Sequence, residues 1–168
     1  MKITYRLATV KDTKQLASWW RDGEVMAHAG FPLGLTIDET KLQDRLLNQK
    51  ESNHQVFIIE YDAQSIGELG VKIEGNEAEI GIKICEVSYQ NKGLGTTILS
   101  KLIADLFLTR NITRIKLDTM LENTRAQKVY ERLGFIKVGV DYDVFIDQLG
   151  NKRSAILYQL SKEDYLKR

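Results

Sequence analysis

A glycine-bearing segment between a strand-like run and a helix-like run is the first place where this sequence has residues suited to chemistry. It reads Gln90, Asn91, Lys92, Gly93, Leu94, Gly95 and Thr96. Glycine lets a backbone approach a ligand closely, and the N–H groups at the start of a helix attract anions. The segment therefore predicts a pyrophosphate cradle, to which Lys92 adds positive charge. A plain glycine-rich turn is the alternative, because neither the GxxxxGK[ST] loop nor the full GxGxxG pattern is present.

A second segment further along the chain has the form N-x-x-A-x-x-x-Y-x-x-L-G-F. It comprises Asn123, Ala126, Tyr130, Leu133, Gly134 and Phe135. Each residue alone has a structural explanation: Asn123 is suited to cap a helix, Gly134 to end it, and Tyr130 to pack along it. Taken one by one, these structural explanations are favoured. The functional information lies in the two segments together.

In this order, the two segments resemble the GCN5-related N-acetyltransferases, the GNAT superfamily. The resemblance is strongest over residues 78–136, and the predicted order of elements extends it along the chain. The strand EIGIKI and the tail DVFIDQLGNKRSAILY are similar to the branch that holds ribosomal-protein alanine and spermidine acetyltransferases. The resemblance implies transfer of an acetyl group from acetyl-CoA to a primary amine, by direct attack in a ternary complex.

The resemblance also implies where acetyl-CoA lies. A central mixed sheet would open between its fourth and fifth strands, here residues 78–85 and 113–119, and the pantetheine arm would fill the gap. The backbone of Lys83, Ile84 and Cys85 would pair with that arm. Residues 90–96 would wrap the pyrophosphate, and Asn123 and Tyr130 would face the cofactor. The family often has arginine where this sequence has Gln90.

The implied reaction needs two proton transfers. An alkyl amine must lose a proton before it attacks, because its pKa lies near 10.4, and the CoA thiolate must be stabilised as it leaves. By its position in the motif, Tyr130 is predicted to be the general acid. Glu79 is predicted to be the base, because it occupies the position of the glutamate base in the histone-acetyltransferase branch. Glu68, a chain of water molecules, or a merely solvent-facing or substrate-orienting Glu79 are the alternatives.

The acceptor side is predicted from the first helix, the loop after it and the region between the last two strands. Carboxylates and aromatic rings together suit a cationic amine, through ion pairs and cation–π contacts. The alternative is that the tryptophans are core residues and the acids a solvated face. The predicted acceptor is a small cationic amine or a protein N-terminus. The predicted pocket comprises Trp19, Trp20, Asp22, Glu24, Phe31 and Glu68, with Asp141 and Asp143 opposite.

The single cysteine and the two histidines are not predicted to do chemistry. Cys85 is interpreted as structural, because a reactive thiol needs a base or a cation beside it and neither histidine is near in sequence. His28 is interpreted as a loop residue. His28 and His54 have no metal-ligand spacing, so no metal is predicted.

Hydrophobic patterning predicts the elements that hold these residues. Capping patterns at Thr9–Asp12 and Thr36–Glu39 each open a helix, and further helices follow the glycine segment and Asn123. Residues 22–34 are predicted as a loop, and the second helix is predicted to bury Leu42, Leu46 and Leu47. Strands are predicted at 3–7, 55–61, 65–73, 78–85, 113–119, from Phe135 onward, and at 154–160. Short turns join the early strands and helices join the later ones. This predicts one α/β or α+β domain over residues 1–168, with a mixed sheet of about six or seven strands and about four helices.

Composition narrows the class of protein. The 168 residues carry 24 Lys and Arg against 23 Asp and Glu, a net charge of +1, which argues against a nucleic-acid partner. No run approaches the roughly 20 apolar residues that cross a bilayer, and no secretory signal is present, so a cytoplasmic protein without a membrane partner is predicted. A homodimer is expected from the family resemblance.

Three functional hypotheses follow. The first is an acetyl-CoA-dependent N-acetyltransferase. The second is a non-catalytic module on the same scaffold that binds or senses acyl-CoA. The third sets the resemblance aside and treats the glycine segment as a nucleotide-phosphate site, which the missing Walker and Rossmann signatures disfavour.

Overall fold

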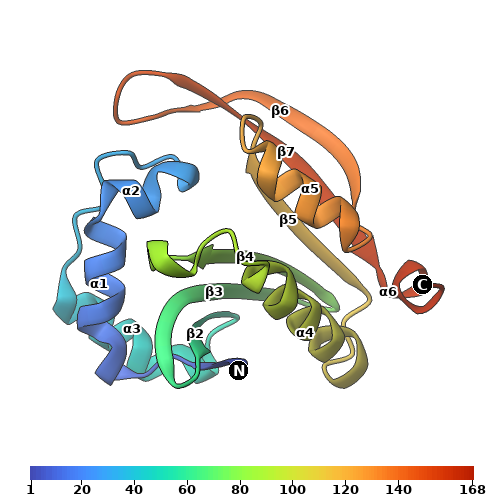
Figure 1. Cartoon of the computed structure of the whole chain (residues 1–168), viewed down its shortest axis with the longest axis horizontal. Helices are drawn as coiled ribbons and strands as arrows, with labels where there is room; N and C mark the ends of the chain where they lie inside the picture. The colour runs from blue at the N-terminus through green and yellow to red at the C-terminus, as the bar shows by residue number, and fades with distance from the viewer.

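A seven-stranded mixed sheet organises the molecule (Figure 1). The computed structural model describes residues 1–168. The strand order is β1-β2-β3-β4-β5-β7-β6, and every neighbouring pair is antiparallel except β4 and β5, which are parallel. The predicted mixed sheet is confirmed. The strands are β1 (Ile3–Leu7), β2 (His54–Tyr61), β3 (Gln64–Glu74), β4 (Glu77–Ile84), β5 (Arg114–Met120), β6 (Ile136–Ile146) and β7 (Lys152–Ser161).

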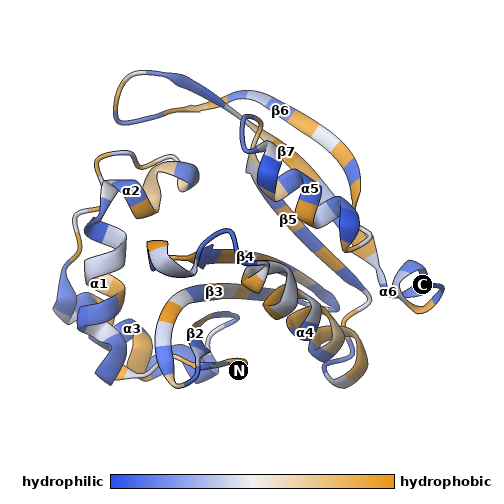
Figure 2. Cartoon of the chain, in the orientation of Figure 1, coloured by the Kyte–Doolittle hydropathy of each residue, from blue (hydrophilic) through white to orange (hydrophobic).

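Helices cover both faces of this sheet. α4 and α5 lie over one face and enclose a core of 22 buried residues, while α1 and α3 cover the other face over 11 buried residues. Figure 2 shows that the apolar residues of α4 gather toward the sheet, as expected for a helix that buries one side. The helices are α1 (Thr13–Arg21), α2 (Gly23–Met26), α3 (Glu39–Asn48), α4 (Leu94–Thr109), α5 (Thr124–Arg132) and α6 (Lys162–Leu166), with 3-10 turns η1 (Val10–Asp12), η2 (Ala27–Ala29), η3 (Gln49–Glu51) and η4 (Val87–Tyr89).

The parallel pair β4 and β5 separates soon after it forms. Only residues 77–79 of β4 pair with residues 114–116 of β5, whereas β4 pairs with β3 from Glu77 to Ile84. Beyond Glu79, one edge of β4 therefore has no strand beside it. Figure 1 shows the two halves of the sheet diverging from this point. This gap between β4 and β5 is the opening that the resemblance implied between the fourth and fifth strands.

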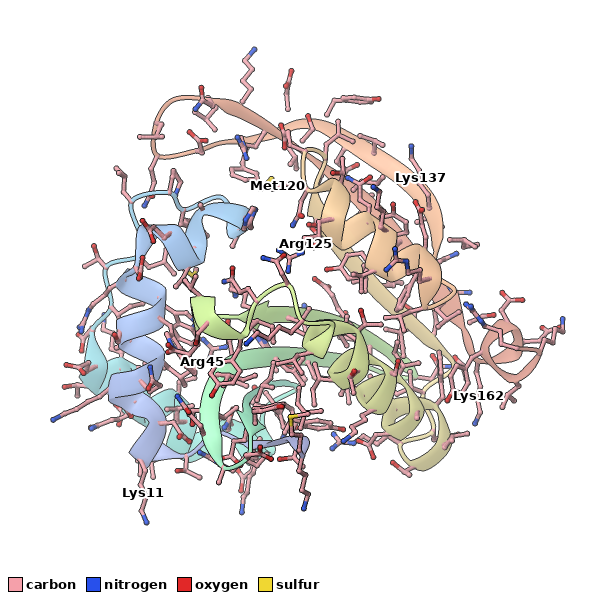
Figure 3. The ribbon with its side chains drawn as sticks, in the orientation of Figure 1. Lys11, Arg45, Met120, Arg125, Lys137 and Lys162 are labelled. Atoms are coloured by element: carbon pink, nitrogen blue, oxygen red, sulfur yellow. The ribbon has the colours of Figure 1, made fainter.

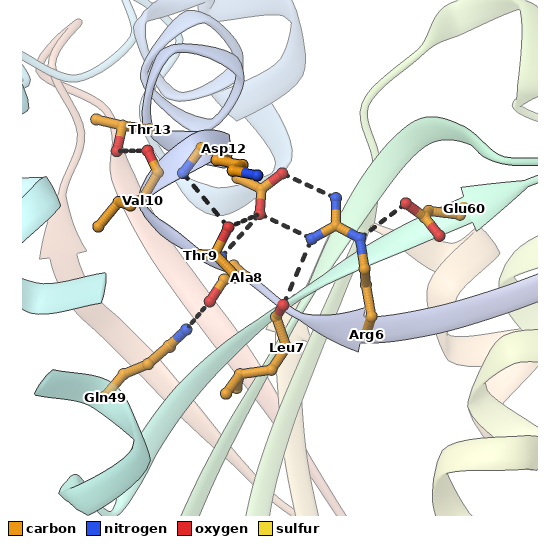
Figure 4. Close-up of polar contacts among 10 residues, drawn as sticks. Arg6, Leu7, Ala8, Thr9, Val10, Asp12, Thr13, Gln49 and Glu60 are labelled. Carbon is orange, nitrogen blue, oxygen red and sulfur yellow. Dashed lines mark hydrogen bonds and ion pairs between the residues drawn. The ribbon is translucent and has the colours of Figure 1, made fainter. Parts of the chain in front are cut away.

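A polar cluster after β1 fixes the start of α1 over the sheet (Figure 4). The guanidinium of Arg6 donates two hydrogen bonds to Asp12, at 2.8 and 2.9 Å, and one to Glu60 at 2.8 Å. Asp12 also accepts the backbone N–H of Thr9, which completes the predicted capping box. Gln49 donates to the carbonyl of Ala8 and so joins the end of α3 to the same corner. These contacts determine where the tryptophans of α1 lie.

Several local predictions were wrong. The predicted loop at 22–34 contains α2 and η2, which begin at an Asp22 side chain that accepts the backbone N–H of Glu24. The cap of α3 is Asp38 rather than Thr36, because the Asp38 carboxylate accepts two backbone N–H groups. Leu47 is 65% exposed instead of buried. The C-terminal helix α6 was not predicted. No helix has the length and apolar character that crossing a membrane requires.

Candidate active site

The free edge of β4 presents backbone groups to the gap. The Cys85 N–H donates to the carbonyl of Ile66 on β3 at 2.8 Å. Because successive residues of a strand direct their peptide groups to opposite sides, the peptide groups of Ile84 and Ile82 point away from β3 and into the gap. Of the three residues predicted to pair with pantetheine, Ile84 therefore has this orientation, while Lys83 and Cys85 face β3. The Ile84 carbonyl accepts the side-chain amide of Gln90 at 2.9 Å.

The predicted pyrophosphate segment leads directly into α4. Gly93 precedes the helix with φ of 74°, and no side chain caps the helix N-terminus. The N–H groups of Leu94, Gly95 and Thr96 donate to no backbone or side-chain acceptor of the chain. Nothing lies within 4 Å of a Cβ built at Gly93. Free donors at the start of a 16-residue helix, with space above them, form a site suited to an anion.

Two cations lie close to this helix start. The Lys92 ammonium is 5.6 Å from the centre of the Tyr89 ring, which holds it beside η4. Arg125 extends from the start of α5 into the space that separates α5 from the connection between β4 and α4 (Figure 3). Arg125 is exposed and forms no ion pair within the chain. Both side chains are placed to contribute positive charge near a bound phosphate.

Tyr130 has a buried ring and an unbonded hydroxyl. The residue is 7% exposed, and its ring packs edge-on against Phe135 and Tyr158, with ring centres 6.2 and 5.8 Å apart. Its hydroxyl forms no hydrogen bond within the chain, yet it is not among the atoms cut off from solvent. Burial, and then the charge of Asp118, raise the pKa of Tyr130 to about 12. The phenol therefore stays protonated near neutral pH and is able to donate.

Asn123 caps α5, as one of its two interpretations predicted. Its side-chain oxygen accepts the N–H of Ala126 at 3.2 Å, and its amide donates to the Thr119 hydroxyl at 3.2 Å. These bonds join the end of β5 to the helix that carries Tyr130. The cap therefore determines where the phenol lies relative to β5.

Glu79 and Asp118 lie on the same face of neighbouring strands. Glu79 is the last β4 residue that pairs with β5, opposite Lys116, and Asp118 follows Lys116 by two residues. Glu79 is exposed. Asp118 forms no ion pair. Desolvation, and then the negative charge of Glu79, raise the pKa of Asp118 above its ordinary value.

Glu68 and Trp20 form a buried polar contact rather than an open pocket wall. Glu68 is 5% exposed and accepts hydrogen bonds from Trp20 Nε1 at 3.1 Å and from Lys83 Nζ at 2.6 Å. Trp20 is itself 8% exposed. Because both of these partners already occupy the buried carboxylate, the geometry disfavours Glu68 as the base.

An acidic cleft of about 560 Å³ lies between the first helices and the end of β4. The structure brings three predicted acceptor residues, Trp19, Asp22 and Glu24, into it, and it leaves Trp20, Phe31 and Glu68 outside its lining. Glu86, the third acid, accepts a hydrogen bond from Trp19 Nε1 at 2.8 Å. No lysine or arginine lines this cleft. Its lining comprises Gln15, Ser18, Trp19, Asp22, Glu24, Val25, Cys85, Glu86, Val87, Ser88 and Gln90.

Cys85 lies in this lining but is 3% exposed as a residue. Burial, and then the charge of Glu68, raise the pKa of the Cys85 thiol far above its ordinary value. Such a thiol is a poor nucleophile at neutral pH. No group of three potential metal-binding side chains occurs in the chain.

The comparisons with known proteins agree with this geometry. A model of the acetyltransferase (GNAT) domain family matches residues 2–136, well over half of the chain. The chain belongs to the GNAT family. The uncharacterized N-acetyltransferase p20 of Bacillus licheniformis is 24% identical over 173 residues, which cover 98% of this chain and 95% of that protein. As a GNAT protein, the chain is an acetyl-CoA-dependent N-acetyltransferase.

Solved structures of other GNAT proteins share the fold. The spermidine N-acetyltransferase of Vibrio cholerae, solved with CoA and spermine, has a TM-score of 0.86 and 20% identity, with 98% of each chain covered. The ribosomal-protein-alanine N-acetyltransferase of Brucella melitensis has a TM-score of 0.78 and 19% identity, with 94% of this chain and 99% of that chain covered. At these identities the likeness extends to the fold.

Three further residues around this GNAT site were not named by the sequence analysis. Asp118 stands out only once β5 is seen to leave β4 two residues earlier. Glu86 directly follows the strand that carries the predicted cofactor contacts, which was an available signal. Arg125 lies two residues after the predicted cap Asn123, on the turn of α5 that faces the glycine segment. Its positive charge so close to a predicted cofactor residue was an available signal.

Proposed function

We propose that this enzyme acetylates a primary amine of a small polycationic acceptor of the polyamine class, by direct attack on acetyl-CoA in a ternary complex. The observation that carries the proposal is the acidic cleft. Asp22, Glu24 and Glu86 line it without any cation, and it reaches the end of β4 at Cys85 and Gln90. Carboxylates that have no cationic partner, beside an indole ring, suit an alkylammonium chain. The neighbour from Vibrio cholerae, whose structure contains spermine, supports this acceptor class.

The donor site follows from the free edge of β4. An extended chain with amide groups pairs with an exposed strand edge, and the pantetheine arm of acetyl-CoA has such amides. In the proposed complex, Ile84 pairs with this arm, while the free N–H groups of residues 94–96 bind the pyrophosphate. Lys92 and Arg125 supply positive charge to the phosphates. The backbone around the donor is shaped by the other predicted cofactor residues, which include Lys83, Cys85, Asn91, Gly93 and Asn123.

Tyr130 is proposed as the general acid for the departing thiolate. Its hydroxyl is free of partners and its raised pKa keeps the proton in place. For the amine, Asp118 is proposed as the proton acceptor. It shares a face with Glu79 just beyond the point where β5 leaves β4, its carboxylate forms no ion pair, and desolvation raises its pKa. Glu79, the base predicted from sequence, then acts on Asp118 through its charge.

The two carboxylates are separable by experiment. Asp118→Asn is expected to abolish the ionisation that limits kcat/KM on its acidic side. Glu79→Gln removes a negative charge from beside Asp118 and so lowers the pKa of Asp118. The acidic limb of the kcat/KM profile is then expected to move to lower pH, with turnover retained. Loss of turnover in Glu79→Gln together with an unchanged pH profile in Asp118→Asn would assign the base to Glu79.

The acceptor proposal is tested by release of CoA thiol across a panel of linear polyamines, aminoglycosides, amino acids and N-terminal peptides. A linear polyamine is expected to be the best acceptor. Asp22→Asn and Glu24→Gln are expected to raise its KM, while Glu39→Gln, at a half-exposed acid of α3 outside the cleft, serves as the control. Turnover of peptides alone would reject the proposed acceptor class.

The direct mechanism is tested by steady-state kinetics. Initial rates against both substrates are expected to give intersecting lines, because both substrates are bound before chemistry occurs. Parallel lines would indicate an acetylated enzyme. Cys85→Ala is expected to keep intersecting lines, since the buried thiol takes no part.

A further inference from the structure

Two segments far apart in sequence meet at the open end of the gap between β4 and β5. Phe145 of β6 and Met120 at the end of β5 both lie against Gly30, which follows η2. A Cβ built at Gly30 would lie 2.5 Å from Cζ of Phe145 and 3.2 Å from Cε of Met120. Gly30 has φ of 93°, a conformation that side chains rarely adopt. Glycine at this position lets η2 approach the C-terminal strands closely.

The tip of the hairpin formed by β6 and β7 makes a second contact with the same region. The side chain of Gln148 accepts the N–H of Leu33 and donates to the carbonyl of Gly34, both at 2.7 Å. Figure 1 shows the hairpin arching across toward α2, and Figure 3 shows Met120 in the space beneath it. We call the contacts of Gly30 with Phe145 and Met120, and of Gln148 with residues 33–34, the bridge.

The bridge completes a ring of elements around the gap. At one end, β4 and β5 are paired. From there β5 runs to Met120, which meets Gly30, and η2 leads back through α2 to α1. α1 returns to the end of β4 through the hydrogen bond from Trp19 to Glu86. A molecule that approaches the free edge of β4 from the side opposite α4 and α5 therefore passes inside this ring.

Beyond the ion pair of Arg153 with Glu122, the residues of the hairpin near its tip are mostly exposed. β6 is an edge strand of the sheet, and its residues Tyr142, Val144 and Ile146 are more than half exposed. Leu149 at the tip is 59% exposed. The two hydrogen bonds of Gln148 and the ring of Phe145 are the contacts that join this end of the hairpin to residues 30–34.

We propose that the bridge sets the cross-section of the acceptor, so that this enzyme accepts an amine on a narrow, unbranched chain and rejects the amino terminus of a folded protein. The inference rests on the proposed function and adds a steric criterion to its electrostatic one. The carboxylates of the acidic cleft attract any ammonium group, including that of a basic peptide. The ring admits only acceptors whose width near the amine is that of a methylene chain.

The test compares two diamines of equal charge and different width, and adds a folded protein as the widest acceptor. Thiol release is measured with 1,4-diaminobutane, with a diamine branched next to the reacting amine, and with a small folded protein that has a free N-terminus. The wild-type enzyme is expected to prefer the linear diamine by at least about tenfold in kcat/KM, a discrimination that steric fit readily provides. Gln148→Ala is expected to reduce this preference about tenfold while kcat/KM for the linear diamine changes less than about threefold.

Two further variants make the result interpretable. Leu149→Ala lies on the same hairpin tip but outside the bridge, so it is expected to leave the preference unchanged. Phe145→Leu weakens the other half of the bridge and replaces Gln148→Ala if that variant fails to fold, as judged by circular dichroism. A merely structural role would lower kcat/KM for both diamines equally.

The outcomes separate this inference from the proposed function. Equal turnover of linear and branched diamines by the wild type, or an unchanged preference in both bridge variants, would overturn the inference and leave the proposed function standing. Absence of turnover with every diamine would overturn the proposed function, and the inference with it. A reduced preference in the bridge variants alone would support both.

Discussion

Replacing Tyr130 by Phe removes one hydroxyl that the fold does not use. The hydroxyl has no partner in the chain, and the ring contacts with Phe135 and Tyr158 are kept, so the thermal midpoint is expected to stay within about 1 °C of the wild type. A positioned general acid contributes about 10²–10⁴-fold to a rate. At the low end of that range, kcat falls about 100-fold, which is about 2.7 kcal/mol of lost transition-state stabilisation.

The assay is thiol release at saturating acetyl-CoA, with acetyl-CoA affinity measured separately by calorimetry. The matched control is Tyr158→Phe, because Tyr158 packs beside Tyr130 and donates to Glu131 at 3.1 Å. The control is expected to lower the free energy of unfolding by about 1–2 kcal/mol and to keep its turnover. If Tyr130→Phe retains turnover within about threefold, or loses affinity and turnover in equal proportion, the general-acid reasoning fails.

Three further perturbations test other parts of the structure. Gly93→Val is expected to weaken acetyl-CoA binding at least about tenfold. The control is Gly75→Val in the turn between β3 and β4, where φ is also positive and the space is equally open, so it carries the same backbone strain and is expected to leave binding unchanged. Equal affinities of the two variants by calorimetry would reject the cradle. Asp118→Asn is expected to raise the thermal midpoint at pH 7, because the folded protein raises the pKa of Asp118 and therefore loses stability as pH rises through that pKa. The gain in midpoint should vanish when the pH falls below the unfolded value of 3.8. A midpoint lowered at pH 7 would contradict this. Asp12→Asn is expected to lower the free energy of unfolding by about 1–2 kcal/mol at pH 7, a value reduced for the 41% exposure of the Arg6 side chain. Because the hydrogen bonds from Arg6 lower the pKa of Asp12, this loss of stability should disappear as pH falls below 3.8. Urea titrations at two pH values would show whether it does.

The sheet and its helices were predictable because short-range patterns determine them. Ile80, Ile82 and Ile84 alternate with polar residues or glycine as a strand with one buried face requires, and α4 has an apolar stripe that ends in a core. Thr9 and Asp12 form the capping box that their spacing predicted. Errors fell where local signals are weak. α2 is a single turn within a segment, residues 22–34, that holds three glycines and the only proline. Leu47 has an apolar side chain that the short helix does not bury.

The site was only partly predictable, because its geometry depends on where two strands separate. The motifs gave the glycine segment and Tyr130, but the register that ends β4–β5 pairing at Glu79 is a tertiary property. Asp118 becomes significant only once that register is known. The tryptophans illustrate the same limit. Trp19 and Trp20 both lie in the core, yet each directs its indole N–H to an acid, and only Glu86, the partner of Trp19, lines the cleft.

The bridge has a second role besides selecting acceptors, because it also encloses the free edge of β4. An unpaired strand edge is a template for pairing with any extended chain, and in most proteins such edges are covered or blunted. In the proposed complex the edge stays open for the pantetheine arm, so it cannot be blocked by a proline or a charged side chain. Enclosing the edge within a ring admits narrow ligands and excludes the strands of other proteins. Opening the bridge should therefore have a second effect, because a wider ring exposes the edge of β4. Gln148→Ala is expected to aggregate faster than Leu149→Ala in light scattering. Saturating acetyl-CoA is expected to suppress this difference, because it pairs with the edge. Equal aggregation of the two variants without acetyl-CoA would show that the bridge does not guard the edge.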